Sequence, residues 1–87
     1  MTAIDPRTLP FLPVEPGNTL VLTDAKSAQR KGMDNDDDFY EEVNAEGMVV
    51  AKYHVWHYLN IYPPQNVDHG WRKTLPDGEF IAAGKKA

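Results

Sequence analysis

The sequence predicts a single mainly β or α+β domain, built on a small antiparallel sheet of four to five strands with at most one short helix. Three observations lead to this prediction. A chain of 87 residues has room for one hydrophobic core. Residues 44–47 and 75–78 have the composition of tight hairpin turns. Between these turns, residues 49–62 alternate in character as a strand with two different faces does.

Residues 1–18 are predicted to form an extended, proline-rich strap. Prolines stand at positions 6, 10, 13 and 16. Each proline fixes φ near −65° and lacks a backbone N–H, which excludes a helix or a central strand. The apolar residues of the segment favour packing on the domain; they are Leu9, Phe11, Leu12 and Val14.

Residues 19–23 (TLVLT) form a short β-favouring run, and we expect a strand there. Residues 24–31 are compatible with a two-turn helix, with Thr23 or Asp24 as N-cap and Gly32 just past its end. No glutamate or glutamine completes a capping box, and so short a helix is marginal alone. A loop is the alternative for this segment.

The first predicted hairpin turns at Asn44-Ala45-Glu46-Gly47, which has the form of a type I turn closed by a glycine with positive φ. Such a turn sets the register of the two strands. One face should carry the pairs Val43–Val49, Glu41–Ala51 and Phe39–Tyr53, and the other should carry Glu42–Val50 and Tyr40–Lys52.

The strand after this turn is predicted to have a core face and an aromatic face. The odd-numbered core face is Val49, Ala51, Tyr53, Val55, His57, Leu59 and Ile61. The even-numbered face is Val50, Lys52, His54, Trp56, Tyr58, Asn60 and Tyr62. A helix would also fit some of these spacings, but the Val, Tyr, Trp and His content and the turn upstream favour a strand.

The second predicted hairpin turns at Leu75-Pro76-Asp77-Gly78 and joins residues 71–75 to 79–83. Residues 63–66 (PPQN) are predicted to be a loop, because two successive prolines cannot continue a ladder. Residues 19–84 are therefore expected to form one sheet domain, followed by a short basic tail at 85–87.

Composition excludes several classes of function. Nine Lys and Arg residues against 13 Asp and Glu residues give a net charge of −4, which disfavours nucleic acid and anionic membranes as partners. The chain has no cysteine, no apolar run long enough to cross a bilayer and no signal-peptide pattern. We expect a cytoplasmic protein without a cofactor. We also expect no enzymatic activity, because there is no phosphate-binding loop and Ser27 lacks the glycines of a nucleophile elbow.

The even-numbered aromatic face is the first candidate binding surface. His54, Trp56, Tyr58 and Tyr62 combine large apolar area with polar tips, as residues at binding hot spots do. The alternative is that the strap or the short helix buries this face, because a small domain uses most of its large side chains in the core.

An acidic cluster at residues 34–42 is the second candidate. Its Asp34-x-Asp36-x-Asp38 spacing is similar to the start of a calcium loop, but Phe39 and Ala45 stand where such a loop needs glycine and glutamate. A hydrated acidic loop, a weak divalent-cation site and an acidic docking patch are the alternatives. For the docking patch, we predict Asp36, Asp37 and Asp38 as accessory residues.

The histidines are interpreted as structural or surface residues. His54 and His57 are three positions apart, so on a strand they point to opposite faces and cannot share a metal. A site made from His57, His69 and Asp68 would require the 63–66 loop to fold the chain back, and we predict no metal site.

Residues 7–13 (RTLPFLP) fit the pattern R-x-L-P-x-L-P and resemble a class I ligand of SH3 domains. The resemblance implies a preformed polyproline helix that docks into an aromatic groove. The alternative is a strap that packs on the sheet.

Together these observations predict a small acidic, non-enzymatic protein-binding or adaptor domain that binds a protein partner or a second copy of itself. The predicted binding residues are His54, Trp56, Tyr58, Tyr62, Asp36, Asp37 and Asp38. The alternative is weak binding of a divalent cation through residues 34–42.

Overall fold

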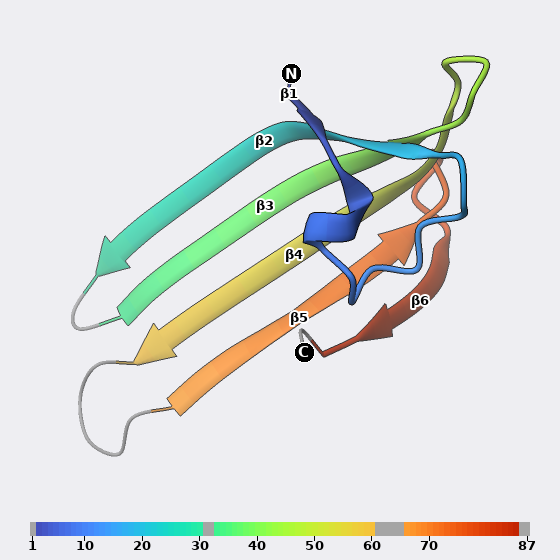
Figure 1. The fold of residues 1–87 in the computed structure, drawn as a ribbon. Helices are drawn as coiled ribbons and strands as arrows, with labels where there is room; N and C mark the ends of the chain where they lie inside the picture. Colours follow the sequence, from blue (N-terminus) through green and yellow to red (C-terminus); the bar gives the residue numbers. More distant parts are fainter. Residues whose placement is uncertain (1, 31–32, 61–65, 86–87) are drawn as a thin grey trace.

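The chain forms one six-stranded antiparallel sheet in which each strand pairs with its neighbours in sequence, in the order β1-β2-β3-β4-β5-β6 (Figure 1). The computed structural model describes residues 2–30, 33–60 and 66–85. The elements are β1 (Thr2–Ile4), a short 3-10 helix (Pro6–Thr8), β2 (Thr19–Arg30), β3 (Met33–Val43), β4 (Val49–Asn60), β5 (Asn66–Thr74) and β6 (Phe80–Gly84).

The predicted antiparallel β-sheet is confirmed, with six strands instead of four to five. The prediction for residues 24–31 was wrong, because β2 continues through them as far as Arg30. Asp24 to Arg30 pair with Phe39 to Met33 of β3. Local capping signals favoured a helix, but a long ladder offers each backbone group of this segment a partner on β3, and such tertiary pairing overrides weak local propensity.

The acidic cluster also differs from the prediction, because it lies in a strand and not in a loop. β3 spans Met33–Val43 and pairs with β2 on one side and with β4 on the other. Side chains alternate along a strand, so Asp36 and Asp38 lie on one face of the sheet and Asp37 lies on the other.

Both predicted turns are confirmed. In the first, the Asn44 N–H donates to the Met48 carbonyl and Gly47 has a φ of 81°. In the second, the Leu75 N–H donates to the Glu79 carbonyl and Gly78 has a φ of 97°. Glycine adopts this left-handed conformation without the steric penalty that a Cβ brings. The predicted 63–66 loop lies almost wholly outside the described residues, and Asn66 already belongs to β5.

The register of the first hairpin was predicted correctly only beside the turn. Val43 pairs with Val49, but a bulge then shifts the ladder by one residue. The observed pairs beyond it are Glu42–Ala51, Glu41–Lys52, Tyr40–Tyr53 and Phe39–His54. A bulge places two residues of one strand opposite one of the other, so every side chain of β3 beyond it changes face relative to the prediction.

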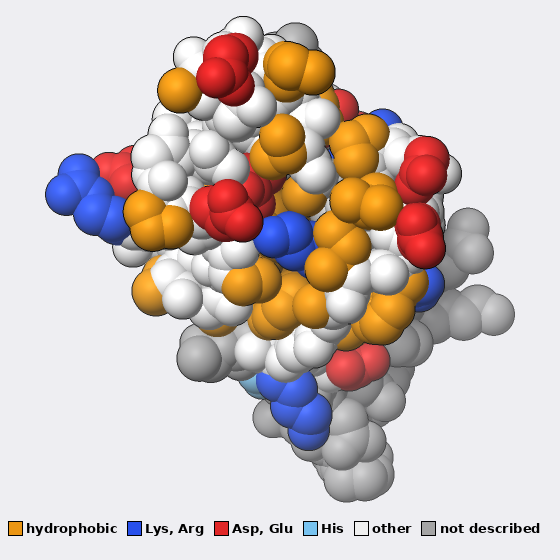
Figure 2. Space-filling model, turned by 90° about the vertical axis from the view of Figure 1, so that its right-hand side faces the viewer, with side chains coloured by type: hydrophobic (Ala, Val, Ile, Leu, Met, Phe, Trp, Pro, Cys, Tyr) orange, Lys and Arg blue, Asp and Glu red, His pale blue; other side chains and the backbone are white. Residues whose placement is uncertain are grey.

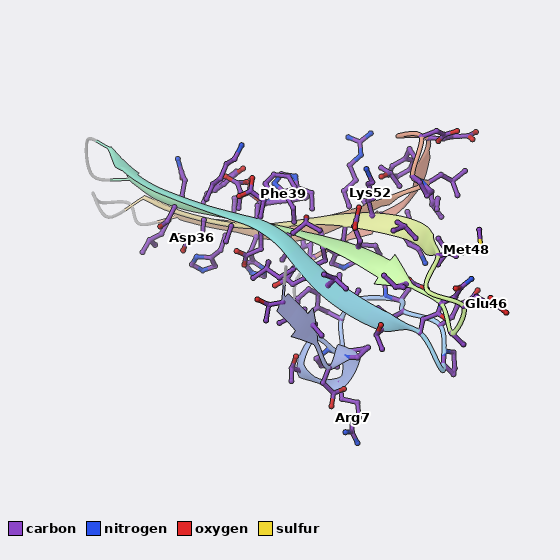
Figure 3. All side chains as sticks on the ribbon, turned by 90° about the horizontal axis from the view of Figure 1, so that it is seen from above. Arg7, Asp36, Phe39, Glu46, Met48 and Lys52 are labelled. Carbon is purple, nitrogen blue, oxygen red and sulfur yellow. The ribbon has the colours of Figure 1, made fainter. Side chains whose placement is uncertain are left out.

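The predicted extended strap of residues 1–18 was wrong in part, because Thr2–Ile4 join the sheet as β1 and Pro6–Thr8 form a turn of 3-10 helix, whose first position tolerates proline. Residues 5–18, which we call the strap, lie on one face of the sheet, the strap face (Figures 1 and 3). The buried core beneath consists of Leu12, Leu20, Tyr40, Ala51, Tyr53, Val55 and Trp71. Three predicted core residues of β4 are therefore buried, whereas Val49 is exposed, His57 and Leu59 are half-buried and Ile61 is outside the described residues. The strap covers only one end of the sheet, and β2 to β5 extend beyond it (Figure 1).

A buried carboxylate ties the strap to the sheet. The Glu42 side chain is 1% exposed and accepts hydrogen bonds from the Tyr53 hydroxyl and the Asn18 amide, both at 2.6 Å. Lys73 Nζ lies 3.5 Å from the Glu42 carboxylate and also donates to the Pro13 carbonyl at 3.2 Å. A buried charge is tolerated only with such partners, so this cluster orients the strap as well as neutralising Glu42.

The same cluster predicts how stability depends on pH. Burial by itself raises the pKa of Glu42, but the hydrogen bonds from Tyr53 and Asn18 and the charge of Lys73 together hold that pKa below its usual range. A lowered pKa stabilises the folded state above the unfolded value, about 4.3 for glutamate, and this contribution is lost as the pH falls further. Urea unfolding between pH 7 and pH 3 should therefore show a loss of stability on acidification that is smaller in Glu42→Gln. Equal losses in the two proteins would contradict this role.

Candidate functional site

The opposite side of the sheet, which we call the open face, carries the predicted aromatic residues. His54, Trp56 and Tyr58 of β4 lie there beside Asp37 and Phe39 of β3. Figure 3 shows Phe39 and Lys52 pointing away from the strap, whereas Asp36 points to the side on which the strap lies. Within the described parts of the chain, no element covers this face. We call Asp37, Phe39, His54, Trp56 and Tyr58 the aromatic site.

Three rings of the aromatic site form a continuous row. Phe39 and His54 are cross-strand partners whose rings stack with centroids 4.7 Å apart and planes 4° apart. The His54 and Trp56 centroids are 5.3 Å apart, with planes tilted by 47°. These separations lie in the favourable range for aromatic pairs, so the row is ordered by its own contacts.

A glycine on the neighbouring strand makes room for Trp56. Gly70 is its cross-strand partner on β5, and a Cβ at position 70 would lie 2.7 Å from Trp56 Cζ2. No real Cβ fits at that distance, so the indole rests directly on the β5 backbone. The ring remains half-buried, with its outer side available for contact.

Asp37 holds the polar tips of two site residues. Its Oδ1 accepts a hydrogen bond from the Tyr58 hydroxyl at 2.6 Å and lies 2.7 Å from His54 Nε2, which acts as the second donor. Burial raises the pKa of Asp37, but these two hydrogen bonds together with nearby charge, including that of Lys26, leave the pKa below its usual range. The bond to Asp37 raises the pKa of Tyr58 to about 12. The hydrogen bond that the phenol donates to Asp37 sets its orientation.

Two cations border the row on opposite sides. Lys26 Nζ of β2 lies 5.8 Å from the Phe39 centroid, and the Arg72 guanidinium of β5 lies 5.0 Å from the centroid of Phe80 on β6. Phe80 is 54% exposed. Carboxylates border the row as well, because Asp24 lies 3.9 Å from Lys26 and Asp68 is the cross-strand partner of Tyr58. The open face therefore presents aromatic surface with a rim of mixed charge.

The structure brings together only part of the predicted site. His54, Trp56 and Tyr58 lie together with Asp37, but Asp36 and Asp38 are on the strap face and cannot border the aromatic row. Tyr62 is outside the described residues. The alternative that the strap buries the aromatic face does not hold, because the strap packs on the other side.

Phe39 was absent from the predicted site, because the predicted register paired it with Tyr53 on the core face. The bulge beside Val43 moves Phe39 opposite His54. Arg72 and Phe80 were absent as well, because only the pairing of β5 with β4 and β6 brings them to the open face. The one sequence signal for these residues was the second hairpin turn, which joins their strands.

The remaining candidates of the sequence are the divalent-cation alternative and the SH3-ligand-like segment. Among the described residues, no group of three or more His, Asp or Glu side chains converges as a metal site would. In the SH3-ligand-like segment, Leu12 is 6% exposed in the core and Arg7 pairs with Asp5 at 2.8 Å. This segment packs on the sheet as a strap.

A second apolar surface lies at the end of the sheet where both turns occur. Met48, Val49, Phe80 and Ile81 are exposed there. Figure 2 looks onto this end, where hydrophobic side chains surround a basic one. A hollow of about 380 Å³ at this end is lined by residues that include Glu42, Ala51, Lys73 and Ile81.

Comparison of the chain with protein-family models, with curated proteins and with solved structures gave no match. In the part of the chain that the structure describes, no helix has the length and apolar character needed to cross a membrane.

Proposed function

We propose that this chain is a small, non-enzymatic protein-binding domain whose contact surface is the aromatic site. The observation that carries the proposal is an ordered row of three rings on a sheet face that no described element covers. Aromatic side chains supply much apolar contact area at a low cost in side-chain entropy.

The side chains of the aromatic site are already held in place before a partner binds, which favours a role in binding. Asp37 fixes His54 and Tyr58, and Gly70 seats Trp56, so little conformational freedom remains to be lost on association. A sheet is stable when its apolar face is covered, and the strap covers only the other face. A partner that covers the open face would therefore bury preformed aromatic surface.

The charges beside the row indicate the chemistry of the partner. Lys26 and Arg72 lie at the rim with Asp68, whereas Asp37 within the site already accepts two hydrogen bonds. We infer a partner protein with an apolar contact surface and a rim of mixed charge, whose carboxylates meet Lys26 and Arg72. Opposite charges across such a rim raise the association rate and fix the orientation of the complex.

The test is an affinity pull-down from lysate of the source organism, followed by titration of the purified partner. Trp56→Ala/Tyr58→Ala should weaken binding by roughly 30-fold or more, since hot-spot truncations cost at least about 2 kcal/mol. Lys26→Glu/Arg72→Glu should slow association. Asp36→Asn, on the strap face, is the matched control and should bind as the wild type does.

The amide dispersion of each variant in NMR shows whether that variant is folded, which the interpretation of the pull-down requires. Loss of the partner by a folded Trp56→Ala/Tyr58→Ala variant, with retention by Asp36→Asn, supports the proposal. Equal retention by all variants would place binding elsewhere, and capture of nothing by the wild type would contradict it. Light scattering shows whether the partner is a second copy, through a mass near twice 9.8 kDa that the double variant abolishes.

A further inference from the structure

Two histidines face each other on the part of the strap face that extends beyond the strap. His57 of β4 and His69 of β5 are direct cross-strand partners, with ring centroids 6.3 Å apart and planes 24° apart. The sequence predicted no metal site at these residues, because such a site requires the chain to fold back between them. The antiparallel pairing of β4 with β5 does fold it back, and the two imidazoles become neighbours.

The two rings are close enough to share a metal ion after a small rotation of their side chains. A metal about 2.0–2.1 Å from one nitrogen of each ring places the ring centres roughly 5 Å apart at a tetrahedral angle, and roughly 6.5 Å apart only when the two nitrogens lie on opposite sides of the metal. The rings here are 6.3 Å apart and nearly parallel, so binding requires both imidazoles to turn about their side-chain bonds and bring one nitrogen each to the same point. Both side chains come from paired strands, so the sheet holds them within this reach.

The surroundings also favour a cation. His69 Nδ1 is buried and has no hydrogen-bond partner, which is costly for a polar atom and unusual in a folded protein. Asp36 lies directly opposite His57 on β3, where the Ser27 hydroxyl donates to it at 2.6 Å. On the His57 side, a hollow of about 380 Å³ leaves room for metal-bound water; it is lined by Ala25, Lys26, Ser27, Asp36, Asp38 and His57.

We propose that His57 and His69 form a two-imidazole binding site for a divalent late transition metal such as Cu²⁺, Ni²⁺ or Zn²⁺. Imidazole suits these ions, and affinity should be highest for Cu²⁺. No group of three or more ligating side chains occurs among the described residues, so water completes the coordination and binding is moderate. The site is on the opposite side of the sheet from the aromatic site and is independent of the proposed function.

The three histidines of the chain provide a matched set of variants. Zn²⁺ and Cu²⁺ titrations by calorimetry should give one saturable site in the wild type and in His54→Asn, whose histidine lies on the open face. His57→Asn and His69→Asn should each weaken binding roughly tenfold or more, because either change removes the second, intramolecular ligand. Tighter binding of Cu²⁺ than of Zn²⁺ is expected in the wild type.

An experiment on the unaltered protein keeps the test decisive even where a variant is poorly folded. Substoichiometric Cu²⁺ should broaden the NMR signals of His57, His69 and their neighbours first, and those of His54 last. Selective broadening of this pair supports the proposal. Absence of saturable binding at millimolar metal, broadening centred on His54 or on the acidic residues alone, or equal affinity in folded His57→Asn would overturn it.

Discussion

Replacing Glu42 with alanine is expected to lower the free energy of unfolding by roughly 2–5 kcal/mol. The substitution leaves the Tyr53 hydroxyl without its carboxylate and removes the counter-charge from Lys73, whose side chain is 14% exposed. It also removes the acceptor of Asn18, so the strap loses a connection to the sheet. A domain of this size has only a few kcal/mol of stability, and much of the population should unfold.

The adjacent residue is a matched control for this prediction. Glu41 pairs with Lys52 on the open face, and Glu41→Ala should change stability by no more than about 0.5 kcal/mol. Urea denaturation followed by tryptophan fluorescence would measure both variants. If Glu42→Ala were as stable as Glu41→Ala, Glu42 would not connect the strap to the sheet as described.

The second large effect distinguishes the two tryptophans of the chain. Trp71 is 9% exposed, belongs to the core and packs against Gly84, where a Cβ would lie 2.9 Å from its ring. Trp71→Ala should therefore cost about 3–5 kcal/mol. Trp56 is half-buried on the open face, and Trp56→Ala should cost only about 1–2 kcal/mol, since part of its surface is already in water.

The comparison of these two variants also tests which face of the sheet contributes more to the stability of the fold. Thermal unfolding at pH 7 should place the midpoint of Trp71→Ala well below that of Trp56→Ala. The reverse order, or equal losses, would mean that the open face contributes as much to the core as the strap face does. In that case the aromatic site would be structural, and the proposed binding role would fail.

Some features follow from short stretches of sequence. The two hairpin turns were predictable because Gly47 and Gly78 stand where the backbone needs positive φ, whatever the rest of the chain does. The side-chain alternation of β4 was predictable for the same local reason. Ala51, Tyr53 and Val55 share the buried face, and His54, Trp56 and Tyr58 share the other, because successive residues of a strand point to opposite sides.

Other features depended on pairing between strands and could not be predicted locally. Asp24 to Arg30 carry the signals of a short helix or a loop, yet they extend β2 because β3 offers a complete ladder. The bulge beside Val43 places Glu42 in the core and Phe39 on the open face. No residue in that region predicts a bulge from the sequence. A bulge forms where the packing of both strands on the core requires a change of register.

The sequence by itself determined where the chain turns and which residues of β4 share a face, since both depend on the conformational preferences of a few adjacent residues. The tertiary structure alone decided that the strap covers the odd-numbered face of β4 and that His57 lies opposite His69. It also decided that Asp37 joins the aromatic row without Asp36 and Asp38. These outcomes are contacts between residues far apart in the chain. They depend on strand register and on which face the strap buries, and neither is encoded in any single segment.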